Sequence, residues 1–220
     1  MTRPEDRAVR PADHETLTAA AESDFPEYFD PPADPSEVLE SWLAAAQRLG
    51  VREPLALAFA TADADGRPST RMVAINAFSP GALVFATQTT SRKSRELAVN
   101  DRASGVLYWR ETGQQIVLSG SVDPLALGES DVMWATRPRA LHPMSVASEQ
   151  SRELADPEWL ARRAAELAVH EDPLPRPARY CGYRFEFHEV EFWCSDPFRL
   201  HRRLVYRRTG GNWQWTRLQP

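Results

Sequence analysis

The 220-residue sequence carries 26 Lys and Arg against 31 Asp and Glu, a formal net charge of −5 at pH 7. This length fits one domain with a substantial core, and the mixed acidic composition provides no global basic field for nucleic acid. No apolar run approaches the roughly 18 residues of a membrane helix, and residues 1–17 lack the apolar segment of a signal peptide. We therefore expect a cytoplasmic protein with no nucleic-acid partner and no membrane partner.

Residues 1–35 are predicted to form a flexible N-terminal arm that is disordered or laid over the body. The stretch FPEYFDPPADPSE has four prolines in thirteen residues, which excludes a helix interior or a central strand. Apolar residues then recur at helical spacing from Ser36, and Gly50 ends this pattern. We expect an amphipathic first helix here and a single folded domain over residues 36–220.

The middle of the chain alternates strand-like runs with short turns. Three runs come first, a short helix follows with Ser91 as its N-cap and Asn100 as its stop, and two further runs are joined by Thr112-Gly113. Such close succession favours antiparallel pairing. The predicted strands are 54–62, 69–78, 82–88, 104–111 and 114–122.

Residues 127–170 have a helical pattern in three segments, GESDVMWATRP, VASEQSRELA and EWLARRAAELAVHE. Between the first two lies RPRALHPM, whose two prolines predict a loop. Three more strands, 180–193, 202–208 and 212–218, close the chain. Strands, then helices, then strands indicate a mainly β protein of the α+β or all-β class, a barrel of antiparallel strands with packed helices.

The stretch SRKSREL at residues 91–97 contains the only lysine among the 26 basic residues. Arg92 and Lys93 stand in the first turn of a predicted helix, where the helix dipole disfavours cations. A phosphate would satisfy these cations together with the free N–H groups of the helix. A solvated basic turn is the alternative interpretation.

A second basic cluster, DPFRLHRRLVYRR, has five arginines and one histidine within residues 196–208. If this segment is a strand, alternation places Arg199, His201 and Arg203 on one face. Positive charge gathered beside aromatic residues such as Trp193 suggests a site for a flat, anionic ligand. A solvated strand face is the alternative.

Other motif classes are missing from the sequence. There is no GxGxxG after a strand, no GxxxxGK[ST] and no GxSxG, so a Rossmann site, a P-loop and an α/β-hydrolase are unsupported. The five histidines never stand at ligand spacing with a cysteine or with one another, and we expect no metal site. Cys181 and Cys194 lie in strand-like aromatic surroundings, which is typical of reduced core thiols.

Taken in order, these residues resemble the pyridoxine 5′-phosphate oxidase family of FMN-binding split barrels. The resemblance runs from about residue 37 to the C-terminus. It implies a split β-barrel and a homodimer with FMN between the subunits. The motifs that carry it include RMV at 71–73, TQTTSRK at 87–93, QQ at 114–115, QS at 150–151, EFW at 191–193, RLH at 199–201 and RLQP at 217–220.

The resemblance also implies roles for individual residues. Arg71, Arg92, Lys93 and Ser151 match positions that hold the FMN phosphate or adjoin it. Arg199 and His201 match positions above the flavin face, where they would orient the substrate, with His201 available for proton uptake. The remaining positions implied to bind the cofactor are Met72, Val73, Thr87, Gln115, Gln150, Trp193 and Arg203.

The implied substrate pocket departs from the pyridoxal-forming enzymes. There a Lys, a Tyr, an Arg and a Ser hold the substrate phosphate, whereas the matching positions here are Asn76, Met133, Arg137 and Leu141. Losing one charge and two hydrogen bonds removes on the order of several kcal/mol of phosphate binding. An apolar pocket with Arg137 left as a carboxylate partner suits a flat aromatic acid better.

A narrower resemblance fits this departure. The run from FPEYFDPPADPSE to STRMV, together with RALHPMSVASEQS, resembles the phenazine-biosynthesis flavin oxidases. It implies oxidation of partly reduced phenazine carboxylic acids, with hydride transfer to flavin N5 and reoxidation by O2 to hydrogen peroxide. The alternatives are a pyridoxine/pyridoxamine 5′-phosphate oxidase, a split-barrel oxidase acting on another substrate, and a non-enzymatic flavin-binding protein.

Overall fold

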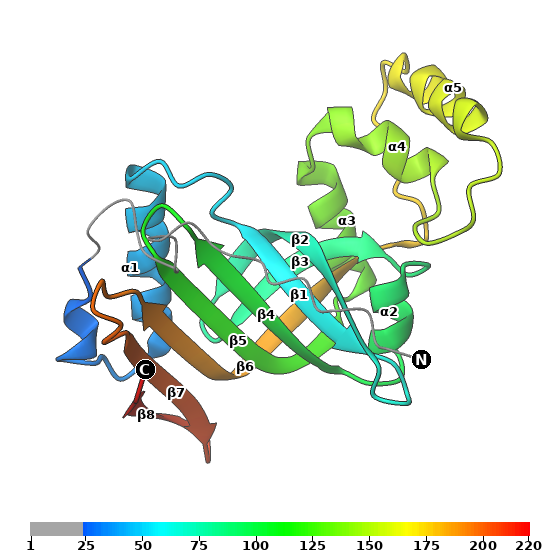
Figure 1. The fold of residues 1–220 in the computed structure, drawn as a ribbon. Helices are drawn as coiled ribbons and strands as arrows, with labels where there is room; N and C mark the ends of the chain where they lie inside the picture. Colours follow the sequence, from blue (N-terminus) through cyan, green and yellow to red (C-terminus); the bar gives the residue numbers. More distant parts are fainter. Residues whose placement is uncertain (1–23) are drawn as a thin grey trace, which may run out of the picture.

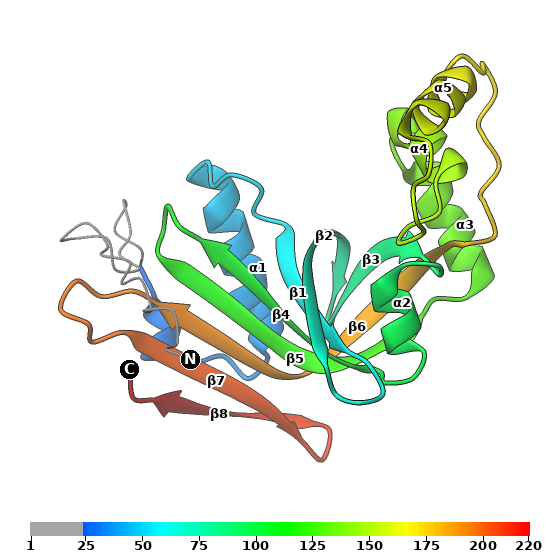
Figure 2. The ribbon, with the colours of Figure 1, turned by 45° about the vertical axis from the view of Figure 1, so that its right-hand side comes forward.

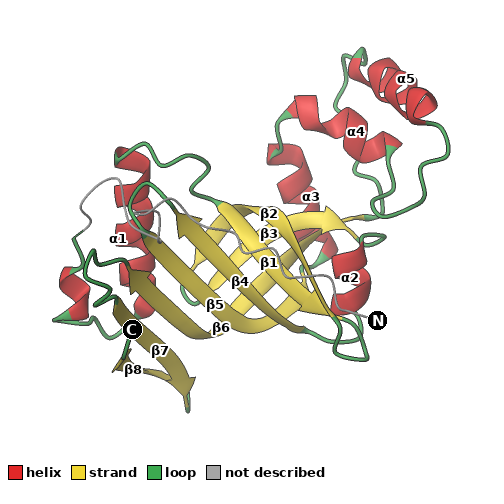
Figure 3. Cartoon of the chain, in the orientation of Figure 1, coloured by secondary structure: helices red, strands yellow, loops and turns green. Residues whose placement is uncertain are grey.

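The computed structural model of the protein describes residues 24–220 (Figure 1). Strands dominate it, and helices cover the ends of the sheet (Figure 3). The elements in chain order are η1 (Pro26–Tyr28), α1 (Pro35–Arg48), β1 (Ala56–Ala62), β2 (Pro68–Ser79), β3 (Ala82–Gln88), α2 (Arg92–Leu97), β4 (Arg102–Trp109), β5 (Gln114–Pro124), α3 (Leu127–Thr136), η2 (Arg139–Leu141), α4 (His142–Ala147), α5 (Pro157–Ala168), β6 (Tyr180–Cys194), β7 (Arg202–Thr209) and β8 (Asn212–Leu218).

One antiparallel sheet organises the protein. Its strand order is β3-β2-β1-β4-β5-β6-β7-β8, and β3 also pairs with β6, so the first six strands close into a barrel. The long strand β6 serves both parts, because it pairs with β3 through residues 180–186 and with β7 through residues 189–194. This architecture confirms the predicted α+β class and the split barrel of antiparallel strands with packed helices.

Closure of the barrel depends on a close approach between β5 and β6. The register between these strands shifts at Ser119/Gly120. A Cβ atom placed on Gly120 would lie 1.8 Å from the backbone oxygen of Glu186, well inside van der Waals contact. Glycine is therefore required at this position for the two paired strands to approach this closely.

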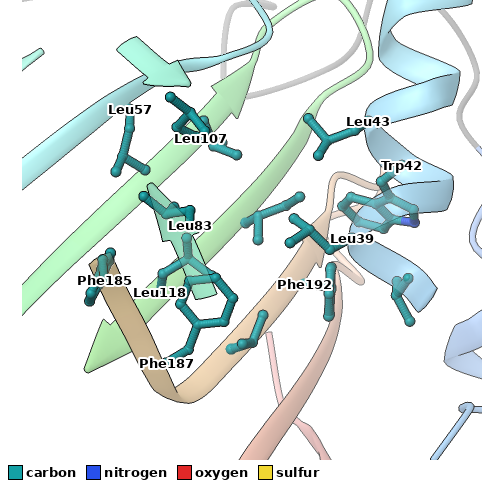
Figure 4. Packing of buried hydrophobic residues seen from close by; sticks show 14 of the residues in the cluster. Leu39, Trp42, Leu43, Leu57, Leu83, Leu107, Leu118, Phe185, Phe187 and Phe192 are labelled. Atoms are coloured by element: carbon teal, nitrogen blue, oxygen red, sulfur yellow. The ribbon is translucent and has the colours of Figure 1, made fainter. Parts of the chain in front are cut away.

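The core lies inside the barrel and continues under α1 (Figure 4). Phe59 packs against Phe85 and Phe185, with ring centroids 5.0 and 5.6 Å away. At one end, Trp42 of α1 meets Phe192 edge-on at 5.4 Å. The helices α1 and α2 lie at opposite ends of the barrel, and α3 to α5 project beyond the α2 end (Figure 2).

The described part of the predicted arm, residues 24–35, lies against α1 and the β7–β8 hairpin. Phe25 is fully buried and meets Trp42 edge-on at 4.7 Å. The hydroxyl of Tyr206 donates to the Pro32 carbonyl at 3.1 Å, and Arg217 donates to the Tyr28 carbonyl at 2.7 Å. Residues 1–23 lie outside the described part of the chain, so the flexible arm over residues 1–35 stays a prediction.

One helical prediction was wrong. The segment VASEQSRELA is mostly loop, because α4 ends at Ala147 and Ser148 is extended. The helix instead begins inside RPRALHPM, where a loop was predicted, because Pro143 stands in its first turn, a position that proline tolerates. The prolines of RPRALHPM therefore mark a helix start and do not exclude a helix.

The cysteines and the helix lengths of the described chain each bear on one expectation from the sequence. Cys181 and Cys194 stand at opposite ends of β6 and both are free thiols, as expected for reduced core cysteines. Within residues 24–220, no helix is long and apolar enough to cross a membrane.

Candidate cofactor and substrate site

Three cationic side chains gather where the first turn of α2 meets β2. Arg71 and Arg92 share one buried carboxylate, Glu96, with N–O distances of 3.3 and 2.7 Å. Lys93 lies close enough to Arg71 for the two positive charges to repel each other, and its Nζ donates to Thr87 Oγ1 at 2.9 Å. With one acid for three bases, this cation cluster has excess positive charge that an anion would neutralise.

Lys93 is the electrostatically strained member of the cation cluster. Burial lowers the pKa of its ammonium group, and repulsion from Arg71 lowers it further. Burial also lowers the pKa of Arg71, although Glu96 opposes this shift. Within residues 24–220, Lys93 makes no ion pair. A bound phosphate would supply the missing partner, so the residues present fit a phosphate-bearing ligand.

The loop after α4 closes over the cation cluster. Gln150 Oε1 accepts a hydrogen bond from Thr87 Oγ1 at 2.8 Å, and Ser151 Oγ accepts one from the backbone N–H of Arg92 at 3.0 Å. Ser151 has a φ of 64°, in the left-handed region that a serine enters at a cost. The structure thus brings together six of the predicted cofactor residues: Arg71, Thr87, Arg92, Lys93, Gln150 and Ser151.

Gln88 fixes this loop, and the sequence analysis missed it. Its side chain is 2% exposed, and its Nε2 donates to the carbonyls of Ser145 and Ser148, both at 3.1 Å. Its Oε1 accepts from the backbone N–H of Gln150 at 2.9 Å. A polar residue at a strand end usually faces water, so only its place inside TQTTSRK could have indicated this role.

A second group of predicted residues lies near the α1 end of the barrel. Gln115, Trp193 and Arg203 are cross-strand neighbours on β5, β6 and β7. Glu191 holds the guanidinium of Arg203 with both carboxylate oxygens, at 2.6 and 3.0 Å. These hydrogen bonds raise the pKa of Arg203. The His201 ring lies against Trp193, with centroids 4.7 Å apart.

The predicted common face of Arg199, His201 and Arg203 was wrong. β7 begins only at Arg202, and the preceding residues form a turn in which Arg199 has a φ of 65°. The carboxylate of Asp196 accepts the backbone N–H of Phe198 at 2.8 Å and folds this turn. His201 is oriented by its Trp193 contact, whereas Arg199 is exposed at the surface.

The two groups are far apart in one chain. Thr87 pairs with Cys181 at the start of β6, whereas Gln115 pairs with Trp193 twelve residues later on the same strand (181 to 193). At about 3.3 Å per residue this is about 40 Å of strand. The two groups therefore lie at opposite ends of β6. Of the other two predicted cofactor residues, Met72 is 62% exposed and Val73 packs against the core.

The four predicted substrate residues lie around the α3 end of the barrel. Asn76 Oδ1 accepts from the backbone N–H of Ala86 at 3.0 Å, and Ala86 pairs with Gly182. A Cβ atom on Gly182 would lie 2.5 Å from the sulfur of Met133. Asn76 and Met133 therefore flank the same short stretch of β3 and β6.

Arg137 and Leu141 continue this surface beyond α3. Arg137 Nη2 donates to Ser145 Oγ at 3.4 Å, its guanidinium lies 5.7 Å from the Tyr180 ring centroid, and its Nε is buried without a hydrogen-bond partner. Burial raises the pKa of Tyr180, so it remains a neutral phenol. Leu141 is 47% exposed. The arrangement offers one cation, with its Nε–H still unpaired, beside apolar side chains.

Comparison with known proteins defines the class. Residues 43–171 match the family described as pyridoxamine 5′-phosphate oxidase, and residues 180–220 match the pyridoxine 5′-phosphate oxidase C-terminal dimerisation region. The chain therefore belongs to the pyridoxamine 5′-phosphate oxidase family. An FMN-binding protein of this kind from Nostoc punctiforme shares the fold, with a TM-score of 0.70 at 18% identity over 82% of this chain and 96% of that one.

Within this family the chain is similar both to dihydrophenazinedicarboxylate synthases and to pyridoxine/pyridoxamine 5′-phosphate oxidases. The dihydrophenazinedicarboxylate synthase of Burkholderia lata is 52% identical over 206 residues, covering 94% of this chain and 97% of the relative. The pyridoxine/pyridoxamine 5′-phosphate oxidase of Rubrobacter xylanophilus is 41% identical over 189 residues, covering 85% and 87%. The crystal structure of Burkholderia lata PhzG in complex with tetrahydrophenazine-1-carboxylic acid superposes with a TM-score of 0.89 at 51% identity, covering 92% of this chain and all of that one. Both levels of the predicted resemblance are confirmed.

Proposed function

We propose that the protein is an FMN-dependent oxidase that aromatises partly reduced phenazine carboxylic acids. The observation that carries this proposal is the substrate surface, where Arg137 is the one cation among Asn76, Met133 and Leu141. A planar acid can pair its carboxylate with Arg137 and lay its rings on apolar side chains. The similarity of this chain to dihydrophenazinedicarboxylate synthases, and to a relative whose structure contains tetrahydrophenazine-1-carboxylic acid, supports the same substrate class.

The cation cluster supports FMN as the cofactor. Lys93 and Arg71 would hold its phosphate, and Gln150 and Thr87 would adjoin the ribityl chain. When bound, FMN supplies the two-electron chemistry, accepting a hydride from the substrate and passing the electrons to O2. The protein's contribution is to bind the phosphate, orient the two ring systems and exclude water.

We propose that a second copy of the chain completes the site. About 40 Å of strand separates the cation cluster from the Trp193 group, and residues 180–220 match a dimerisation region. The outer face of β1 presents small side chains beside the exposed Met72 and Tyr108 of the neighbouring strands, a surface suited to close packing. A homodimer would place the Trp193 group of one subunit beside the cation cluster of the other, with one FMN between them.

His201 is the residue best placed to move a proton. Its Nδ1 accepts the backbone N–H of Asp196 at 3.1 Å, so the neutral ring carries its proton on Nε2. The contact with Trp193 holds the plane of the ring. In the proposed dimer, His201 Nε2 exchanges a proton with the substrate, while the exposed Arg199 and the partly buried Arg137 bind its carboxylate.

Oxygen uptake tests the proposal. FMN-loaded protein should consume O2 with a dihydrophenazine carboxylate and not with pyridoxine 5′-phosphate. Arg137→Ala should raise KM for the acid, whereas Arg139→Ala, which removes the exposed neighbouring guanidinium, serves as the control. Comparable uptake with pyridoxine 5′-phosphate would favour the second candidate, a pyridoxine/pyridoxamine 5′-phosphate oxidase, which the 41% identical relative represents.

A further inference from the structure

Glu96 is a buried carboxylate at the centre of the cation cluster. Its side chain is 5% exposed and extends from α2 toward β1 and β2. Oε2 accepts hydrogen bonds from Thr61 Oγ1 at 2.5 Å and Ser69 Oγ at 2.6 Å, and Oε1 accepts from Arg92 Nε at 2.7 Å. A buried carboxylate of this kind is tolerated because its oxygens are satisfied by donors.

The charge of Glu96 is permanent at physiological pH. Burial by itself disfavours the ionised form, but the hydrogen bonds from Ser69, Thr61 and Arg92 outweigh burial and lower the pKa of Glu96 to about 2. The carboxylate therefore acts as a fixed negative charge beneath the three cations.

Two hydroxyls connect Glu96 to Arg71. Arg71 Nη1 donates to Thr61 Oγ1 at 2.6 Å and to the Phe59 carbonyl at 3.2 Å, and Nη2 donates to Ser69 Oγ and, at 3.3 Å, to Glu96. Thr61 and Ser69 in turn donate hydrogen bonds from their hydroxyls to the carboxylate. Four of the five N–H groups of Arg71 are thus committed to the protein, which fixes its guanidinium and leaves its charge and its Nε–H for a ligand.

We infer that Glu96 is a positioning residue that makes the site selective for a phosphate monoester. It holds Arg71 and Arg92 in place, and it reduces the charge of the cluster from three to two, which matches a dianionic phosphate. Lys93, the cation that Glu96 does not contact, remains free to pair with that phosphate. This inference rests on the proposed function, because it takes the phosphate to be that of FMN.

The test compares FMN with riboflavin, which differs from FMN by the missing phosphate. Binding of each to flavin-free, full-length protein is followed by quenching of flavin fluorescence. The wild-type protein should prefer FMN, and Glu96→Gln should reduce this preference by about tenfold or more, with riboflavin affinity unchanged. Glu189→Gln is the matched control, because it removes a partly exposed carboxylate that pairs with Arg207 at 2.6 Å, and its preference should equal that of the wild type.

The outcomes separate the inference from the proposed function. If the wild-type protein shows no preference for FMN, the phosphate site itself is refuted. If it prefers FMN and Glu96→Gln keeps the full preference, or weakens both flavins equally, the positioning role is overturned. Should Glu96→Gln fail to fold, Ser69→Ala decides, because it removes one bridge to Arg71 without changing charge. A severalfold loss of the preference supports the role, and no loss overturns it.

Discussion

Replacing Lys93 by Met should weaken FMN binding strongly without harming the flavin-free protein. Two unit charges about 4 Å apart interact with about 4 kcal/mol at an effective dielectric constant of 20. Since Lys93 is only partly buried, we expect a little over half of this, about 2 to 3 kcal/mol, or on the order of a 100-fold rise in Kd. The stability of the flavin-free protein should not fall, because Lys93 makes no ion pair within residues 24–220 and its charge is disfavoured by burial and by Arg71.

Two assays together check this prediction. Fluorescence titration gives the Kd for FMN, and thermal denaturation with and without FMN gives the stabilisation by ligand, which should shrink in Lys93→Met. The control is Arg95→Met, which removes an exposed cation of the same helix that donates to the Thr90 carbonyl. Unchanged FMN affinity in Lys93→Met, or an equal loss in Arg95→Met, would refute the reasoning.

Three further predictions follow from buried or oriented side chains. Glu96→Gln should lower the free energy of unfolding, measured by urea titration, by about 3 kcal/mol at pH 7. Because the folded-state pKa of Glu96 is about 2 against an ordinary 4.5, this difference from the wild type should shrink as the pH falls from 4.5 toward 2. A difference that does not change with pH would contradict this. Phe25→Ala should cost about 3 to 4 kcal/mol in the same assay, since Phe25 is fully buried against Trp42, and a loss under about 1 kcal/mol would show that the segment is dispensable. His201→Ala should slow anaerobic flavin reduction by about 100-fold while FMN stays bound; unchanged stopped-flow kinetics would exclude its role.

Most strands could be predicted because alternation and turn residues are local signals. The predicted strand 82–88 is β3, and the predicted 212–218 is β8. The tight link at Thr112-Gly113 was predicted between two strands, and Gly113 has a φ of 60°, which glycine adopts without strain. Short connections account for the pairings of β1 with β2, β2 with β3, β4 with β5, β6 with β7 and β7 with β8. The pairings of β1 with β4, β5 with β6 and β3 with β6 join segments far apart in sequence, and no local signal indicates them.

The errors occur where tertiary contacts override local pattern. Residues 148–151 have helix-forming neighbours. Two hydrogen bonds hold them in a loop instead, because the backbone N–H of Gln150 donates to Gln88 at the end of β3 and the backbone N–H of Arg92 donates to Ser151. The turn before β7 likewise depends on Asp196, whose carboxylate accepts two backbone N–H groups. Neither interaction has a sequence period that could reveal it.

The candidate site was only partly predictable for a similar reason. SRKSREL indicated an anion site because cations stand at a helix start, and the resemblance added Arg71 and the loop residues. Glu96 escaped notice, because an acidic residue on a short polar helix normally faces water. Only the packing of α2 on β1 and the hydrogen bond from Ser69 of β2 place it in the interior. The distance between the cation cluster and the Trp193 group required the register of β6.

The most direct test of the proposed function is an anaerobic mixing experiment. FMN-loaded protein is mixed with a dihydrophenazine carboxylate and, separately, with pyridoxine 5′-phosphate, and the flavin absorbance is followed before any O2 is admitted. We predict rapid bleaching by the tricyclic acid alone. Bleaching by pyridoxine 5′-phosphate alone would contradict the meaning given to Asn76, Met133 and Leu141 and would assign the protein to oxidation of vitamin B6 phosphates.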